Sequence, residues 1–96
     1  MTIGYVEAVL SAENTWTDEI EIEDAFNVSV VLSALKIATV TLQRSYDKGV
    51  IWKDYKTYTL SYEDCVSELE RKALLRIGIK TDDYSGQGTA TVRISF

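Results

Sequence analysis

Hydrophobic and polar residues alternate along much of the chain, and this two-residue period is typical of β-strands with one buried face. Three runs show the alternation most clearly, and their apolar positions are Phe26, Val28, Val30 and Leu32; Ala38, Val40 and Leu42; and Ala90, Val92, Ile94 and Phe96. Val, Ile and Thr together make up 27 of the 96 residues, and their β-branched side chains favour pleated sheet. We therefore expect half-buried strands of antiparallel sheet.

Short polar or glycine-containing segments separate the alternating runs. Residues 11–15 indicate a loop, Asp47-Lys48-Gly49 a hairpin tip and residues 82–88 a longer hairpin connection. The strands expected from this division lie at residues 3–10, 19–23, 25–32, 37–44, 51–59, 61–67, 73–81 and 88–95. About eight short strands in a chain of this length predict an all-β fold, either a two-sheet antiparallel sandwich or a jelly roll. No repeat or linker divides the chain, so we interpret residues 1–96 as a single β-sandwich domain with an acidic N-terminal segment at residues 1–24.

Residues 64–75 are compatible with two interpretations. The segment is rich in helix-forming residues and can make about two helical turns with Val66, Leu69 and Ala73 facing inward. The interpretation we favour is strand, turn and strand, and a short helix remains the alternative. Both are compatible with the same fold class.

Charge is unevenly distributed along the chain. Residues 1–35 contain seven acidic residues and no Lys or Arg, whereas residues 36–96 contain ten basic and eight acidic residues. Because the net charge is −5 and no basic stripe is present, the chain is a poor candidate for binding the phosphate backbone of nucleic acid. We interpret the acidic stretch as a solvated strand face and loop; the alternative is a negative surface that attracts a basic partner.

Composition excludes most catalytic and metal-binding chemistry. The chain has no His and one Cys, which removes imidazole catalysis, an internal disulfide and a thiolate metal cluster. The acidic residues lack the spacing of a calcium-binding loop. Cys65 follows two acidic residues, so we expect it to be a small buried side chain and not a nucleophile. A carboxylate pair among Asp54, Glu63 and Asp64 is the catalytic option left, and a domain of this size offers little cleft for it. We therefore expect no enzyme activity, no catalytic residue, no metal and no cofactor.

No segment of the chain has the pattern of a membrane span or a signal peptide. There is no apolar run of about 18 residues, and the first residues lack the basic and apolar regions of a secretory signal. We expect synthesis in the cytoplasm and no membrane partner.

Residues 45–52, Ser-Tyr-Asp-Lys-Gly-Val-Ile-Trp, form the strongest local motif. Asp47 can fold its carboxylate onto backbone N–H groups of its own turn, and Ser45 can add its hydroxyl. Gly49 can adopt a positive φ, and Trp52 can cover the hairpin. The spacing Ser-x-Asp-x-Gly-x-x-Trp resembles the Asp-box hairpin of sialidases and other β proteins, which implies a structural brace remote from catalysis. A sialidase itself requires a propeller of repeated blades, for which this chain is too short.

Four segments together resemble small proteins encoded among the structural genes of tailed phages. They are FNVSV at residues 26–30, ATVTLQRSYDKGVIW at 38–52, RIGIK at 76–80 and GTATVRIS at 88–95. The resemblance implies a viral structural protein of the bacteriophage virion, and within the virion a head decoration (cement) protein that binds the outer capsid surface and stabilises it. It also implies homo-oligomers, trimers or dimers, with the major capsid protein or other virion proteins as partners. The implied location is the virion, assembled in the host cytoplasm.

The surface expected to contact a partner consists of the acidic stretch and the two hairpin tips. Its candidate residues are Asp18, Glu19, Glu21, Glu23, Tyr46, Lys48, Tyr84 and Gln87. We also expect residues 1–10 to reach a neighbouring subunit, because a chain without Pro lacks one of the usual guards of strand edges. Two other functions stay open. One is a neck, tail or fibre-base module of the virion, and the other is a carbohydrate-binding β-sandwich that stacks sugars on Tyr46, Trp52 and Tyr84.

Overall fold

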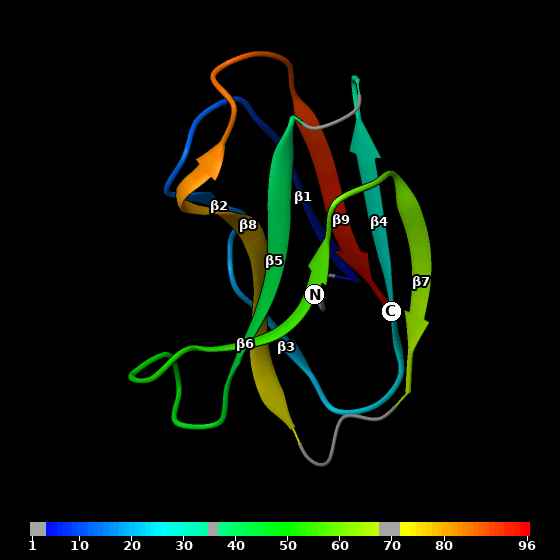
Figure 1. The fold of residues 1–96 in the computed structure, drawn as a ribbon. Coiled ribbons are helices and arrows are strands. Elements are labelled where there is room, and N and C mark those ends of the chain that lie inside the picture. The colour runs from blue at the N-terminus through cyan, green and yellow to red at the C-terminus, as the bar shows by residue number, and fades with distance from the viewer. Residues whose placement is uncertain (1–3, 35–36, 68–71) are drawn as a thin grey trace.

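The structure is a computed structural model that describes residues 4–34, 37–67 and 72–96 (Figure 1). These residues form nine β-strands and contain no helix. The strands are β1 (Tyr5–Leu10), β2 (Thr15–Trp16), β3 (Ile20–Ile22), β4 (Phe26–Leu32), β5 (Ala38–Ser45), β6 (Lys53–Tyr58), β7 (Tyr62–Val66), β8 (Ala73–Tyr84) and β9 (Ala90–Ser95). Within the described ranges, no helix is long and apolar enough to cross a membrane.

The strands form two antiparallel sheets that pack together (Figure 1). The four-stranded sheet has the order β1-β9-β4-β7, and the five-stranded sheet has the order β2-β8-β5-β6, with β3 also on β8. The first strand therefore pairs with the last, β2 and β3 with β8, β4 with β7, and β5 with β6. The two halves of the chain run together like one long hairpin rolled into two layers, which is the strand order of a jelly roll. The expected all-β, two-sheet antiparallel fold is confirmed.

The alternating apolar residues meet between the two sheets. Val40 lies opposite Ile79 in the five-stranded sheet, and Val28 lies opposite Ile94 in the four-stranded sheet. All four side chains are fully buried in the same hydrophobic cluster. Since burying one such side chain contributes roughly 1.5–3 kcal/mol, the residues that set the alternating pattern also stabilise the fold.

Two strand boundaries differ from expectation. Residues 11–15 were expected to be a loop, but Thr15 and Trp16 form β2, which pairs with β8 through only two residues and is too short to show a period. Residues 82–84 were expected in the hairpin connection, but they extend β8 to Tyr84. The extension is irregular, with a positive φ of 73° at Asp82 and a register shift between Ala38 and Val40 on the facing strand.

Residues 64–75 contain no helix where the structure describes them. β7 ends at Val66 and β8 begins at Ala73, so the strand interpretation is confirmed at both ends. Residues 68–71, including Leu69, lie outside the described residues. The expected burial of Cys65 is wrong: Val66 points into the core, so the neighbouring Cys65 lies on the opposite face of the strand and is exposed.

The first strand pairs with another strand of the same chain. Tyr5–Leu10 pairs with β9 in six consecutive register positions, from Tyr5 opposite Ser95 to Leu10 opposite Ala90. Residues 5–10 therefore have a strand partner within the chain, and β1 lies at the edge of its sheet. Contact of residues 1–10 with a neighbouring subunit stays a prediction. Residues 1–3 lie outside the described part of the chain.

Candidate functional site

The hairpin between β5 and β6 is closed by hydrogen bonds from two side chains. The buried Ser45 hydroxyl accepts the backbone N–H of Gly49 at 2.8 Å and donates to Asp47 Oδ1 at 2.7 Å. Asp47 Oδ1 also accepts the backbone N–H of Ile51 at 2.9 Å. This bond from Ile51, followed by the one from Ser45, lowers the pKa of the Asp47 carboxyl. The turn itself requires positive φ at Lys48 (61°) and Gly49 (89°).

Trp52 packs over this turn and meets the acidic stretch there. A Cβ atom placed on Gly49 would lie 3.7 Å from Trp52 Cζ2 and 3.6 Å from Glu19 Oε1. The indole ring and the Glu19 carboxylate therefore both lie against the hairpin tip. Residues 45–52 and residue 19, far apart in sequence, form one corner of the molecule.

Arg76 connects this corner to β2. Its guanidinium carbon lies 4.3 Å from the ring centroid of Trp16 and 4.4 Å from that of Trp52, so both rings contact the cation. Nε and Nη2 of Arg76 donate to Gln43 Oε1 at 3.0 and 2.8 Å. Burial lowers the pKa of Arg76, and the nearby Glu19 raises it in part. Arg76 stays protonated at neutral pH, because an arginine pKa lies so far above it. We call Trp16, Arg76 and Trp52 the arginine ladder.

A polar network extends the arginine ladder across the outer face of the five-stranded sheet. Gln43 Nε2 donates to Asp54 Oδ1 at 2.9 Å, and Lys80 Nζ donates to Asp54 Oδ2 at 2.7 Å. The hydrogen bond from Lys80, and then that from Gln43, lowers the pKa of Asp54. Sequence analysis missed Trp16, Arg76, Gln43 and Lys80 as partners, because they come from three strands that only the fold places together.

The acidic stretch follows the alternation of β3. Ile20 and Ile22 are buried, while Glu19, Glu21 and Glu23 are exposed. Lys72 Nζ lies 3.5 Å from Glu21 Oε1 and 3.8 Å from Glu23 Oε1, so one cation partly neutralises two of these carboxylates. This geometry agrees with the solvated strand face that the sequence indicates.

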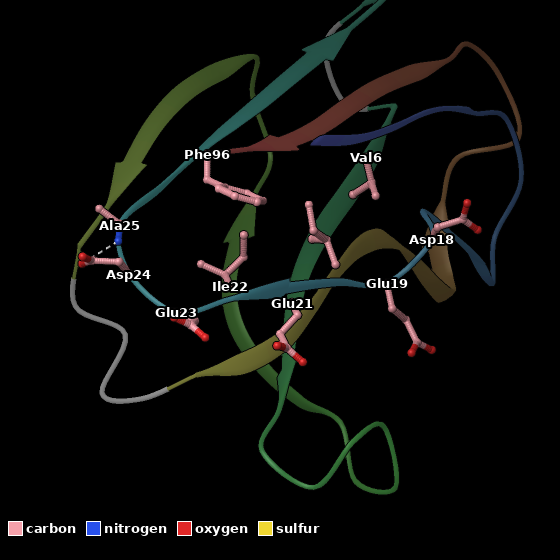
Figure 2. Close-up of a pocket in the computed structure, with 10 residues that line it drawn as sticks. Val6, Asp18, Glu19, Glu21, Ile22, Glu23, Asp24, Ala25 and Phe96 are labelled. Carbon is pink, nitrogen blue, oxygen red and sulfur yellow. Dashed lines mark hydrogen bonds between the residues drawn. The ribbon is translucent and has the colours of Figure 1, made fainter. Parts of the chain in front are cut away.

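A groove of about 780 Å³ lies between β3 and the edge of the four-stranded sheet (Figure 2). Val6 and Phe96 point toward β3, Ile22 points back toward them, and the carboxylates of Glu19 and Glu21 point away (Figure 2). The groove therefore has an apolar floor, and the Glu19 and Glu21 carboxylates lie on the opposite side of β3. Its lining residues are Val6, Asp18, Glu19, Ile20, Glu21, Ile22, Glu23, Asp24, Ala25 and Phe96.

The eight expected contact residues lie in two groups at opposite ends of the sandwich. Tyr46 and Lys48 follow Ser45, which lies opposite Leu74, whereas Tyr84 lies opposite Ala38 at the other end of the same strands. Asp18, Glu19, Glu21 and Glu23 belong with the first group, since β3 pairs with residues 73–75. Gln87 belongs with Tyr84, whose hydroxyl donates to the Gly88 carbonyl at 2.7 Å.

The aromatic residues expected to stack a sugar are divided in the same way. Tyr46 and Trp52 belong to the first hairpin and Tyr84 to the opposite end, so the three rings do not form one platform. Arg76 already contacts the Trp52 ring, and the Arg44 guanidinium carbon lies 5.2 Å from the Tyr46 ring centroid.

Exposed apolar side chains mark the outer face of the four-stranded sheet. Val9 and Val31 both lie opposite Thr91 and are 66% and 50% exposed. Tyr5 is on the same face of β1 and contacts Arg93, whose guanidinium carbon lies 4.6 Å from the ring centroid. This face was not predicted from the sequence. The signal available was Val31, which stands at a position where the alternating pattern otherwise places a polar residue.

Within the described ranges, no three His, Cys, Asp or Glu side chains lie close enough together to hold a metal ion. Comparison with known proteins finds no matching family model, no matching curated protein and no matching solved structure.

Proposed function

We propose that the chain is a non-enzymatic structural protein of a tailed-phage virion, and that it acts as a head decoration protein. In this role it binds the outer capsid surface in many copies and stabilises the shell. The partner is the major capsid protein, and the copies form a trimer or dimer on the lattice.

The observation that carries the proposal is the outer face of the four-stranded sheet. Val9, Thr91 and Val31 form a cross-strand row without charge, and both valines are at least half exposed. An antiparallel sheet with one solvated face normally carries polar residues on that face. A flat apolar row of this kind suits a contact with another protein surface.

The fold and the size of the chain are compatible with this role. Jelly rolls include viral capsid domains, although a fold by itself does not specify a function. A small domain has a modest stability of its own, so burial against sister copies and a shell adds stability by mass action. Repeated weak contacts on a symmetric lattice give high occupancy without a deep pocket.

The proposal is tested by adding the purified protein to phage heads that lack decoration. We expect saturable, stoichiometric binding and heads that withstand higher temperature or lower salt. Heads that neither bind the protein nor gain resistance would refute the proposal.

A pair of variants links this binding to the apolar row. Val31→Lys places a charge in the row and should abolish binding. Val50→Lys changes a 79% exposed valine in the hairpin between β5 and β6, away from the row, and this variant should bind normally. Equal binding of both variants would exclude the row as the contact. Gold-labelled protein on intact particles gives the location: label over the whole shell supports decoration, and label at one vertex indicates a neck or tail module instead.

A further inference from the structure

Polar side chains close the side of the sandwich between β6 and β7. These two strands are each the last strand of their sheet (Figure 1). Four of their side chains lie on the core-facing side, because each is opposite a buried apolar residue of the neighbouring strand. The four are Lys56, Tyr58, Tyr62 and Asp64. Charged and phenolic groups therefore occupy positions that are apolar on the adjacent strands.

These side chains contact one another across the two sheets. The Tyr58 hydroxyl donates to Asp64 Oδ2 at 2.9 Å, and Lys56 Nζ lies 3.8 Å from the same oxygen. Neither contact uses the second carboxylate oxygen, Oδ1. The rings of Tyr58 and Tyr62 are stacked, with their centroids 6.1 Å apart. A carboxylate, an ammonium group and an aromatic pair are thus brought together at one place.

A cavity of about 420 Å³ lies over this group of side chains. It is lined by residues 56–60 together with Tyr62 and Asp64. Leu60 and Tyr62 are 58% and 57% exposed. The connection that carries Leu60 is held to β4, because the Ser61 hydroxyl accepts the backbone N–H of Leu32 at 2.9 Å. The cavity therefore combines apolar and aromatic walls with a small number of fixed polar groups, which is typical of small-ligand sites.

The charges of this cavity favour a neutral ligand. Lys56 and Asp64 are one cation and one anion at ion-pair distance, so a charged ligand that approached one of them would meet a like charge beside it. A purely apolar ligand would cover the half-buried Asp64 carboxylate without offering it a hydrogen-bond donor. A sugar meets both conditions, because each hydroxyl can donate and accept while the C–H face of the ring can pack against an aromatic side chain.

We propose that the cavity between β6 and β7 binds a neutral pyranose sugar. The sugar packs its C–H face against the Tyr62 ring, Asp64 Oδ1 accepts one of its hydroxyls, and the Lys56 ammonium donates to the adjacent hydroxyl oxygen. This site shares no residue with the apolar row of Val9, Thr91 and Val31, so it does not depend on a role in a virion.

The test is an NMR titration of the isotope-labelled full chain with methyl β-D-glucopyranoside, methyl β-D-galactopyranoside and cellobiose. At least one of these sugars should cause saturable shifts of backbone amides within residues 56–64, with a millimolar dissociation constant. Cyclohexanol has a six-membered ring with a single hydroxyl and should cause no saturable shift there. The proposal would be overturned if all three sugars left residues 56–64 unchanged, or if cyclohexanol bound as well as the sugars.

Variants of Tyr62 test the aromatic contact. Tyr62→Ala removes the ring and should weaken sugar binding by about tenfold or more, whereas Tyr62→Phe keeps the ring and should bind within about twofold of the unmodified protein. Tyr5→Ala is the matched control, because Tyr5 is an exposed tyrosine of β1 outside the cavity, and it should bind normally. Equal weakening by Tyr62→Ala and Tyr5→Ala would contradict a site at Tyr62.

A second pair of variants tests the polar contact. Asp64→Asn replaces the charged acceptor with a neutral one of similar size and should weaken binding by about tenfold, while Asp18→Asn, an exposed aspartate outside the cavity, should not. Inward-pointing charges can also serve to protect sheet edges from pairing. Unchanged sugar affinity in Asp64→Asn would assign the charge pair to that role and refute the proposed site. If Tyr62→Ala fails to fold, Asp64→Asn and the cyclohexanol comparison decide the question.

Discussion

The guanidinium carbon of Arg76 lies 4.4 Å from the ring centroid of Trp52, so the central strand β8 is joined directly to the hairpin between β5 and β6. Trp16 contacts the same cation at 4.3 Å, which adds β2 to the assembly. Three segments distant in sequence thus share one charged group. The hydrogen bonds of Ser45 and Asp47 hold the turn in shape, and Arg76 holds that turn against the sheet.

Replacing Arg76 should destabilise the protein clearly. Arg76→Met removes two cation–π contacts and leaves the buried Gln43 Oε1 without its donor, for an expected loss of about 1–3 kcal/mol in the free energy of unfolding. Urea denaturation followed by Trp fluorescence measures it. Arg93→Met is the matched control, because Arg93 contacts the ring of Tyr5, which is exposed. This control should cost about 0.5 kcal/mol. Equal losses for the two variants would show that the arginine ladder has no special stabilising role.

Removing the Ser45 hydroxyl should open the hairpin. Ser45 is 2% exposed, and its oxygen serves the N–H of Gly49 as well as the Asp47 carboxylate. Ser45→Ala leaves the Gly49 N–H without its acceptor and removes one of the two hydrogen bonds to Asp47 Oδ1, which should cost about 1–3 kcal/mol. Ser85→Ala, in the exposed hairpin at the other end of the sandwich, provides the comparison and should change stability by less than about 0.5 kcal/mol. The free energies come from denaturant titrations, and a silent Ser45→Ala would argue against the bracing role of the motif.

A methyl group on Gly78 should displace β2. A Cβ atom there would overlap the Thr15 carbonyl oxygen and lie 2.7 Å from Trp16 Cε3. We expect Gly78→Ala to cost about 2–4 kcal/mol and to change the Trp emission, since Trp16 must leave Arg76. Gly86→Ala separates crowding from backbone strain: its Cβ would meet nothing within 4 Å, but its φ of +93° disfavours alanine. That variant should cost about 1 kcal/mol with an unchanged spectrum. A Gly78→Ala protein of normal stability would mean that β2 is not packed as described.

Acid should weaken the protein through Asp47 and Asp54. The folded state lowers the pKa of both carboxyls, so their contribution is complete above the unfolded value of about 4 and is lost as the pH falls through the lower folded values. At the alkaline end, the bond to Asp54 raises the pKa of Lys80, so its contribution is lost only as the pH rises through that raised value. Asp54→Asn should make the free energy of unfolding fall less steeply as the pH falls. It should also move the loss of the Lys80 contribution to a lower pH, because the bond that raises the pKa of Lys80 is removed. A variant whose acid limb matches that of the unmodified protein would contradict the assignment.

The strands and the first hairpin were predictable because their signals are local. Phe26, Val28 and Val30 alternate with polar neighbours within one strand, and Ser45, Asp47 and Gly49 interact within a single turn. Cys65 was predicted wrongly because acidic neighbours and small size say nothing about strand phase. Its exposure follows from Val66, whose burial depends on the facing sheet.

The candidate surfaces were less predictable because they combine distant strands. Nothing local relates Trp16 to Arg76, or Val9 to Val31. The first pair is in contact across neighbouring strands, and the second pair flanks Thr91 on the strand between them. The antiparallel pairing of β5 with β8 places Tyr46 and Tyr84 at opposite ends of the sandwich, although sequence reasoning had grouped them on one surface.

The amino-acid sequence by itself determined the β class, most strand positions and the internal bracing of the first hairpin, because a two-residue period and a turn motif act over a few neighbouring residues. Only the tertiary structure decided which strands are neighbours, and with them the arginine ladder and the apolar row. Strand pairing depends on long-range burial in a shared core, and that burial is a property of the whole chain.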